Sequence, residues 1–114
     1  MNDIERIVEA HKKFTFERNW DRFQTPKNLS MALSVEVAEL VEIFMWLNEK
    51  QATSLKEDRL NAASEEIADV FLYLLRLADT LGIDLIKATD QKMKKNIEKY
   101  SVEKGLTLAE LLID

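Results

Sequence analysis

Residues 34–47 have the sequence SVEVAELVEIFMWL, and residues 64–77 have the sequence SEEIADVFLYLLRL. Aligned from their first residues, the two segments share serine, glutamate, alanine and leucine at equivalent places. Each contains an acidic pair with a spacing of three, and the acidic residues are Glu36, Glu39, Glu66 and Asp69. An uncompensated ionised carboxylate in apolar surroundings costs on the order of several kcal/mol. Something in or around these segments must therefore compensate the charges.

The spacing places each acidic pair on one face of a helix, because residues three apart are separated by ~60° when each residue turns ~100°. The neighbours on these faces are apolar or small: Leu29, Ala32, Leu33, Leu40 and Ile43 on the first, and Ala62, Ala63, Val70, Tyr73 and Leu77 on the second. Both pairs thus point towards the predicted core. The connection between the helices is short, so they are expected to be antiparallel neighbours whose carboxylates converge.

Four converging carboxylates repel one another, so one or more must take up a proton or bind a cation. A set of oxygen ligands alone suits a hard divalent ion, Mg²⁺ or Mn²⁺. The chain has no cysteine and one histidine, His11, which has no Glu-x-x-His partner. A zinc–thiolate site is therefore excluded. A di-iron or di-manganese carboxylate bundle stays an alternative at this point, although such sites use Glu-x-x-His pairs.

The composition indicates an all-α protein. The chain has 114 residues with two glycines and one proline, which fits a single domain built of helices. A net charge of −5 disfavours binding to nucleic acid polymers. No signal peptide and no membrane-spanning apolar run is recognisable, so a cytoplasmic protein without membrane contact is expected.

The pattern predicts four main helices, arranged as a four-helix bundle. Their predicted ranges are about 2–16, about 29–47, about 55–81 and about 85–100. The expected caps are Asn2, Asn28, Ser54 with Glu57, Gly82 and Asp84. The stretch 48–54 is expected to be a plain connection. A short terminal helix is predicted from Thr107, within a tail at 101–114 that follows a helical domain at 1–100.

The two central helices are apolar on further faces as well. These faces carry Val37, Val41, Phe44, Met45, Ile67, Phe71, Leu72 and Leu75. One bundle of four helices cannot cover all of them, and a helix that is apolar all round is usually buried all round. The sequence therefore predicts a dimer or a larger homo-oligomer.

Two further regions carry candidate binding residues. The polar loop at 18–27 contains Trp20 and Phe23, which could cover the core or form a platform for a planar ligand. On the last main helix, Lys92 and Asn96 flank an apolar stripe and could reach a ligand, whereas Lys95 and Lys99 suit a solvated face.

The ordered Glu-x-x-Glu and Glu-x-x-Asp motifs resemble those of the all-α nucleoside triphosphate pyrophosphohydrolases, which include the MazG-like proteins. The likeness is strongest to the small dCTP pyrophosphatase branch. It extends through the stretches FERNWDRFQTPKNLSMALSVEVAELVEIFMW, EEIADVFLYLLRLADTLGIDL and KMKKNIEKY. It covers residues 1 to about 100.

The resemblance implies hydrolysis of a nucleoside triphosphate, such as dCTP or a related dNTP, to the monophosphate and pyrophosphate. It implies Mg²⁺ held by Glu36, Glu39, Glu66 and Asp69. For the implied reaction a carboxylate must accept a proton from water, and we expect Glu36 or Glu39 to be this base. It also implies a tetramer of paired dimers. The implied substrate contacts are Lys92, Asn96 and Tyr100 at the phosphates and sugar, and Phe16, Trp20 and Trp46 at the base. Gln24 is expected near the base too, where close relatives often carry histidine, so the base preference is left open.

One different class of function competes with this interpretation. The acidic faces could belong to a non-catalytic interaction module whose carboxylates pair with basic residues of another protein. Such a module would neither bind a metal ion nor turn over a nucleotide.

Overall fold

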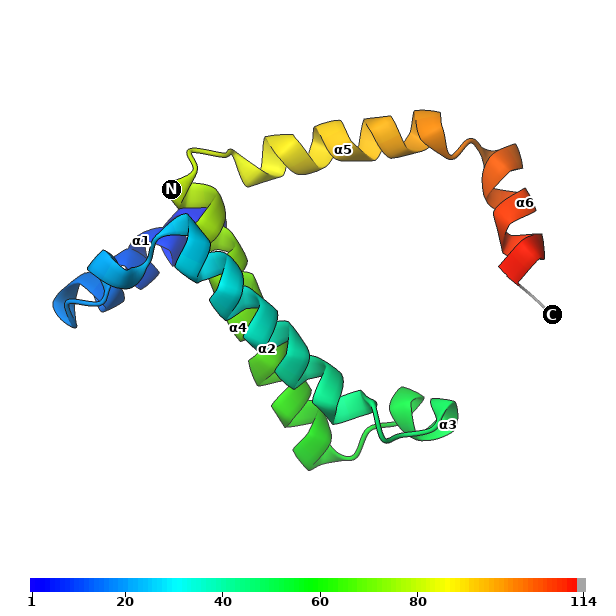
Figure 1. Ribbon diagram of the computed structural model, residues 1–114, viewed down its shortest axis with the longest axis horizontal. Coiled ribbons are helices and arrows are strands. Elements are labelled where there is room, and N and C mark those ends of the chain that lie inside the picture. Colours follow the sequence, from blue (N-terminus) through cyan, green and yellow to red (C-terminus); the bar gives the residue numbers. More distant parts are fainter. Residues whose placement is uncertain (113–114) are drawn as a thin grey trace. The chain divides into compact units, whose positions relative to one another are not determined.

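A computed structural model describes residues 1–112, and in this range the chain forms helices and no strand (Figure 1). The elements are α1 (Asp3–Glu17), the 3-10 helix η1 (Asp21–Phe23), α2 (Pro26–Phe44), α3 (Glu49–Thr53), α4 (Glu57–Thr80), α5 (Leu85–Lys99) and α6 (Val102–Leu112). The predicted all-α fold class is confirmed.

The chain divides into two compact units, of which the first is Met1–Gly82 and the second begins at Ile83. In the first unit, α2 and α4 lie side by side and antiparallel, and α1 packs against α4 (Figure 1). Arg59, near the start of α4, donates a hydrogen bond of 3.1 Å to the carbonyl of Ile43, near the end of α2. The core of this unit is small and consists of Thr15, Leu29, Ala63, Leu75 and Ala78.

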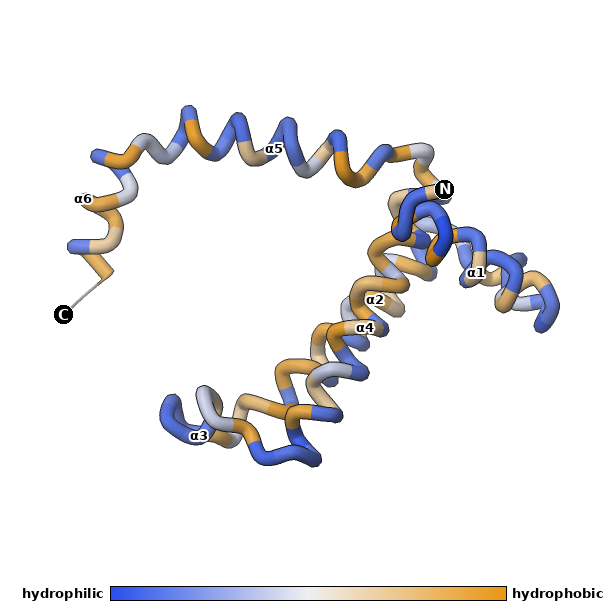
Figure 2. The backbone as a smooth tube through the Cα atoms, turned by 180° about the vertical axis from the view of Figure 1, so that it is seen from behind, coloured by the Kyte–Doolittle hydropathy of each residue, from blue (hydrophilic) through white to orange (hydrophobic). Residues whose placement is uncertain are grey.

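The second unit contains α5, which was the fourth helix expected of the bundle, and α6. The predicted division of the chain at residue 100 remains a prediction. Figure 2 shows apolar residues along both α2 and α4, and alternating polar and apolar residues along α5. Among residues 1–112, no helix combines the length and the apolarity needed to cross a bilayer.

The cap predicted for α2 is wrong. Thr25, not Asn28, caps this helix, and its hydroxyl accepts a hydrogen bond from the Asn28 backbone N–H. Pro26 takes the first helical position, which suits its fixed φ and its lack of an N–H. The Asn28 side chain instead donates a hydrogen bond of 2.9 Å to the carbonyl of Phe23 and closes the preceding loop.

The connection between α2 and α4 also differs from its prediction. It contains the short helix α3, which starts with a capping box formed by Asn48 and Gln51. Ser54 ends α3, and α4 follows Lys56 without a side-chain cap, so the predicted Ser54–Glu57 box is wrong. The Asn-x-x-Gln pattern of this capping box is visible in the sequence. The helix that follows it has only five residues, which is too short to show helical periodicity.

Of the other predicted helix ends, three are confirmed and the start of the terminal helix is wrong. Asn2 caps α1 and Asp84 caps α5, as predicted. Gly82 has a φ of +68°, a left-handed conformation that glycine adopts without steric cost. The terminal helix starts at Val102 and not at Thr107, whose hydroxyl hydrogen-bonds to the Glu103 carbonyl inside α6.

Candidate metal and nucleotide site

Three of the four predicted carboxylates converge where α2 and α4 pack together. Glu36, Glu39 and Glu66 each contribute an oxygen atom, and these atoms all lie within 4.8 Å of one another. The register of the two antiparallel helices brings Glu36 and Glu39 of α2 beside Glu66 of α4, and Glu39 is the exposed member of the group. The convergence predicted from the sequence is therefore present for these three residues.

Two oxygen atoms of this cluster are buried without a donor. The Oε2 atoms of Glu36 and Glu66 have no hydrogen-bond partner among the described residues. A buried carboxylate oxygen without a partner is costly, and a cation in contact with it would remove that cost. The cluster therefore fits a hard divalent cation, as the donor chemistry of the sequence predicts.

The electrostatics of the cluster agree with this interpretation. Burial, proton sharing with Glu66 and the nearby charges of Glu39 and Asp69 raise the pKa of the Glu36 carboxyl from 4.5 to about 7. Hydrogen bonding with Glu36 lowers the pKa of Glu66, but burial and the same negative charges raise it by more, and the net direction is upward. The two carboxyls thus form a pair that favours one shared proton when no cation is bound.

Asp69 lies outside the three-carboxylate group but close enough to act on it. Burial is the main cause of the raised pKa values of Glu36 and Tyr73, and the charge of Asp69 adds to both. The charge of Asp69 also contributes to the raised pKa of Glu66. Asp69 also lines a cavity of about 320 Å³ between α1, α4 and the loop around η1. The residues that line the cavity are His11, Phe14, Thr15, Trp20, Gln24, Asp69, Leu72 and Tyr73.

A second cavity of about 370 Å³ adjoins the first through shared walls. Trp20, Gln24 and Tyr73 line both of them, and the second is completed by Phe23, Asn28, Leu29 and Ala32. A mostly apolar hollow with aromatic walls and a few polar groups is typical of a small-molecule site. Because Asp69 lines one cavity, this hollow lies beside the acidic cluster.

Aromatic side chains build one wall of this hollow. Phe14 and Trp20 meet edge to face with ring centroids 5.6 Å apart, and His11 stacks on Phe14 at 6.3 Å. The Arg18 guanidinium lies 3.8 Å from the Phe14 ring centroid. Trp20 itself is half exposed. The loop aromatics Trp20 and Phe23 thus line the hollow, as a platform for a planar ligand would.

Gln24 is held by a polar network that crosses the unit. The Arg76 Nε donates a hydrogen bond of 3.0 Å to the Gln24 Oε1. Arg76 also donates from Nη1 to Asp79 at 3.1 Å, and Lys12 lies 3.6 Å from the same carboxylate oxygen. Burial and the charge of Arg76 lower the pKa of His11, which favours a neutral imidazole beside the cavity.

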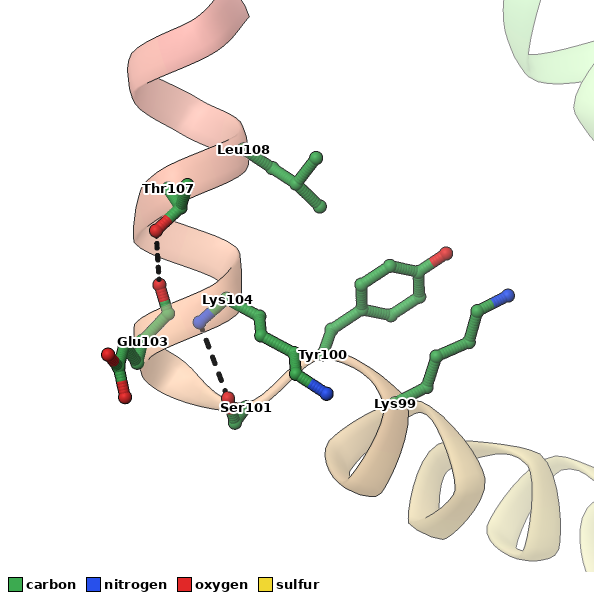
Figure 3. A pocket seen from close by; sticks show the side chains of 7 residues that line it. All are labelled: Lys99, Tyr100, Ser101, Glu103, Lys104, Thr107 and Leu108. Atoms are coloured by element: carbon green, nitrogen blue, oxygen red, sulfur yellow. Dashed lines mark hydrogen bonds between the residues drawn. The ribbon is translucent and has the colours of Figure 1, made fainter.

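Two of the predicted base contacts do not line this hollow, and three further predicted contacts belong to the other unit. Phe16 and Trp46 are 72% and 83% exposed and line neither cavity. Lys92, Asn96 and Tyr100 belong to the second unit, on α5 and at its end. There Tyr100 lines a pocket at the α5–α6 junction together with Lys104 and Leu108 (Figure 3).

Three residues at or beside the hollow are not among those that the sequence predicts: Tyr73, His11 and Arg76. Tyr73 follows Asp69 by one helical turn and was counted only as an apolar neighbour. In the sequence, His11 is considered only as a metal ligand that has no Glu-x-x-His partner. Of these residues, only Arg76 has a sequence feature that could have indicated a role. It is a single charged residue that directly follows the apolar run at 70–75.

The two helices that carry the acidic residues belong to a region that matches a known protein family. The sequence profile of the MazG-like family matches residues 31–111, which include both acidic motifs. The chain belongs to the MazG-like family. The predicted resemblance is confirmed, and the family match extends beyond residue 100 into α6.

Two individual proteins are similar to this MazG-like chain over most of its length. It is 40% identical over 103 residues to the rat protein named dCTP pyrophosphatase 1, and 39% identical over 101 residues to the human protein of that name. These matches cover 87% and 85% of this chain but 59% and 58% of the relatives, so the chain spans less than two thirds of their length.

A solved structure is similar as well. The crystal structure of a pyrophosphatase from Archaeoglobus fulgidus aligns with a TM-score of 0.83 and 40% identity. The alignment covers 89% of this chain and 94% of that one. This chain therefore shares its all-α fold with that crystal structure.

Proposed function

We propose that this protein is a Mg²⁺-dependent nucleoside triphosphate pyrophosphohydrolase that acts on dCTP or a related dNTP. The observation that carries the proposal is the acidic cluster with two buried, unpartnered carboxylate oxygens beside an aromatic cavity. A cation and a triphosphate satisfy both features, since the cation meets the oxygens and the base fills the cavity. The names of the rat and human relatives support dCTP as the first substrate to test.

In this proposal the carboxylates that hold the cation are Glu36, Glu39, Glu66 and Asp69. When bound, Mg²⁺ would neutralise charge on the phosphate oxygens and favour ionisation of an attacking water. Mn²⁺ is a permissible substitute, because it accepts the same oxygen ligands.

The chain's own residues would position the reactants and move one proton. Glu36 or Glu39 accepts a proton from water, whose oxygen forms a bond to the α-phosphorus. The bond between that phosphorus and the oxygen bridging to the β-phosphate breaks, and pyrophosphate leaves. Phosphoryl transfer of this kind depends on positioning and charge neutralisation more than on covalent chemistry.

The remaining substrate contacts are proposed as the resemblance to the MazG-like family implies them. Trp20 and Gln24 lie at the cavity and would contact the base. Phe16 and Trp46 are proposed as further base contacts, and their exposure leaves them free to reach a nucleotide or another subunit. Lys92, Asn96 and Tyr100 are proposed at the phosphates and sugar.

We also propose that the protein acts as a homo-oligomer, a tetramer of paired dimers, in the cytoplasm. Exposed apolar residues on α2 and α4 support an assembly, since Val37, Val41, Ile67 and Phe71 are between 39% and 56% exposed in the single chain. A second copy packed on this face would bury them.

The test is a panel of nucleoside triphosphates with Mg²⁺, scored for pyrophosphate against single phosphate release. We expect pyrophosphate from at least one dNTP, and loss of at least 100-fold in rate in Glu39→Ala and Asp69→Ala. Glu42→Ala is the matched control on α2, because Glu42 lies outside the cluster. Full activity in both cluster variants, or no turnover of any nucleotide with Mg²⁺ or Mn²⁺, would contradict the proposal.

A further inference from the structure

Gln24 is the one neutral amide that lines both cavities, and its orientation is fixed. Its Oε1 faces the Arg76 Nε at 3.0 Å. An arginine side chain has donors and no acceptor, so only the oxygen of the amide can face it. The Gln24 Nε2 is therefore turned away from Arg76.

Arg76 is itself well placed to hold this orientation. Its side chain is 12% exposed, and it is anchored on α4 through a second hydrogen bond to Asp79. A hydrogen bond from a charged donor in partly buried surroundings is stronger than one between neutral groups. Flipping the Gln24 amide would place its N–H groups against the partly buried guanidinium and leave the Arg76 Nε without an acceptor.

We propose that Arg76 is a specificity-determining positioning residue that locks Gln24 as a hydrogen-bond donor towards the cavity. The site would then prefer a nucleobase that offers an acceptor there, a carbonyl oxygen or an unprotonated ring nitrogen. Arg76 acts through Gln24 and lines neither cavity itself. This inference rests on the proposed function, because it assigns the cavity to the base of the nucleotide.

Trp20 and Asp69 make the cavity suitable for a base in this position. Trp20 offers a planar surface at the wall that also contains Gln24, and Asp69 joins the cavity to the acidic cluster. A nucleotide with its phosphates at the cluster would thus reach Gln24 with its base. Stacking on an aromatic ring accepts any base, so the discrimination falls to the hydrogen-bonding group.

The experiment measures kcat and KM for dCTP, dUTP and dATP in wild type and variants. Gln24→Glu keeps an acceptor for Arg76 but removes both donors from the cavity. We expect it to raise KM for the preferred nucleotide about 10-fold, with kcat changed less than about 2-fold, as expected for one lost hydrogen bond. It should also change the KM ratio of dCTP to dUTP, because these bases differ in donors and acceptors at two adjacent positions.

Arg76→Ala frees the Gln24 amide to rotate, so it should narrow the spread of KM values among the three nucleotides. The double variant Gln24→Ala with Arg76→Ala should match Gln24→Ala alone in base preference, because Arg76 acts through Gln24. Arg76→Lys should restore part of the preference, since one donor returns. Arg59→Ala is the control, an arginine on α4 that bonds to a backbone carbonyl far from the cavity.

The outcomes separate this inference from the proposed function. If wild type turns over no nucleotide, the proposed function itself fails. If wild type is active and Arg76→Ala, folded by circular dichroism, keeps wild-type KM ratios, the inference is overturned. Unchanged KM ratios in Gln24→Glu would overturn it as well. Should Arg76→Ala fail to fold, Gln24→Glu decides, because it leaves the Arg76 contacts in place.

Discussion

At the residue scale, Glu36 shows how strongly the fold changes a side chain. Its pKa rises from 4.5 to about 7, chiefly through burial and then through proton sharing with Glu66 and repulsion from Glu39 and Asp69. The surrounding apolar residues of α2 and α4 create the burial, and the antiparallel register creates the repulsion. A cation would relieve both effects.

The raised pKa predicts how stability depends on pH in the absence of metal. A carboxyl whose pKa is higher in the folded state binds its proton more tightly there than in the unfolded chain. Its stabilising contribution is complete below about pH 4.5 and is lost as the pH rises through about 7. With a chelator present, the Tm should therefore decrease as the pH is raised from about 5 to about 8. Thermal unfolding followed by circular dichroism would measure this decrease.

Mg²⁺ should oppose this loss. Protons compete with the cation for the same carboxylates, so Mg²⁺ should raise the Tm more at about pH 8 than at about pH 5. An equal rise in Tm at both pH values would contradict this prediction.

A charge-neutral variant tests the same cluster at one position. Glu36→Gln keeps the shape and removes one negative charge, so without metal at about pH 8 it should stabilise the fold by on the order of 1 kcal/mol, after allowance for solvent screening. It should also abolish most of the rise in Tm caused by Mg²⁺. Glu42→Gln on the same helix should do neither, and a similar response in both variants would count against the cluster.

At the element scale, the start of α2 depends on one side chain. The Thr25 hydroxyl accepts the Asn28 N–H, and Pro26 follows it in the first turn. This start also fixes the loop that carries Trp20 and Gln24. The helix end therefore contributes to the cavity as well as to stability.

Two alanine variants distinguish the observed cap from the one predicted by pattern. Thr25→Ala should cost about 1 kcal/mol of unfolding free energy, because the Asn28 N–H loses its acceptor. Ser54→Ala should cost less than about 0.5 kcal/mol, since Ser54 ends α3 and caps no N-terminus. Urea denaturation would compare them, and a larger loss for Ser54→Ala would refute the assignment of the caps.

At the scale of the whole molecule, the first unit exposes an apolar stripe. On α4 the stripe contains Ile67, Phe71 and Leu74, and on α2 it contains Val37 and Val41. The small core of this unit contrasts with the size of the exposed stripe. The proposed oligomer would give these side chains a partner.

Charge placed in this stripe should break the proposed assembly. Phe71→Glu should lower the apparent mass in sedimentation velocity and weaken association at least 10-fold, because a buried unpaired charge is costly. Phe71→Leu, which keeps an apolar side chain, should retain the assembly. A wild-type protein that stays monomeric at micromolar concentration would defeat this prediction before any variant is made.

The sequence by itself determined the all-α class, most helix ranges and the convergence of three acidic residues. The physical reason is that helical periodicity is local: a spacing of three sets a common face, and the apolar neighbours of Glu36, Glu39 and Glu66 set its direction. The MazG-like motifs were readable for the same reason. The caps at Thr25 and Asn48 were not, since several polar residues nearby could each have served.

Only the tertiary structure decided the cavity and the orientation of its polar groups. Gln24 and Arg76 are 52 residues apart in the chain, and their hydrogen bond forms only because α4 packs beside the loop before α2. The buried oxygens of Glu36 and Glu66 likewise depend on how two helices meet. Contacts of this kind arise from packing between distant segments, which no local pattern of residues specifies.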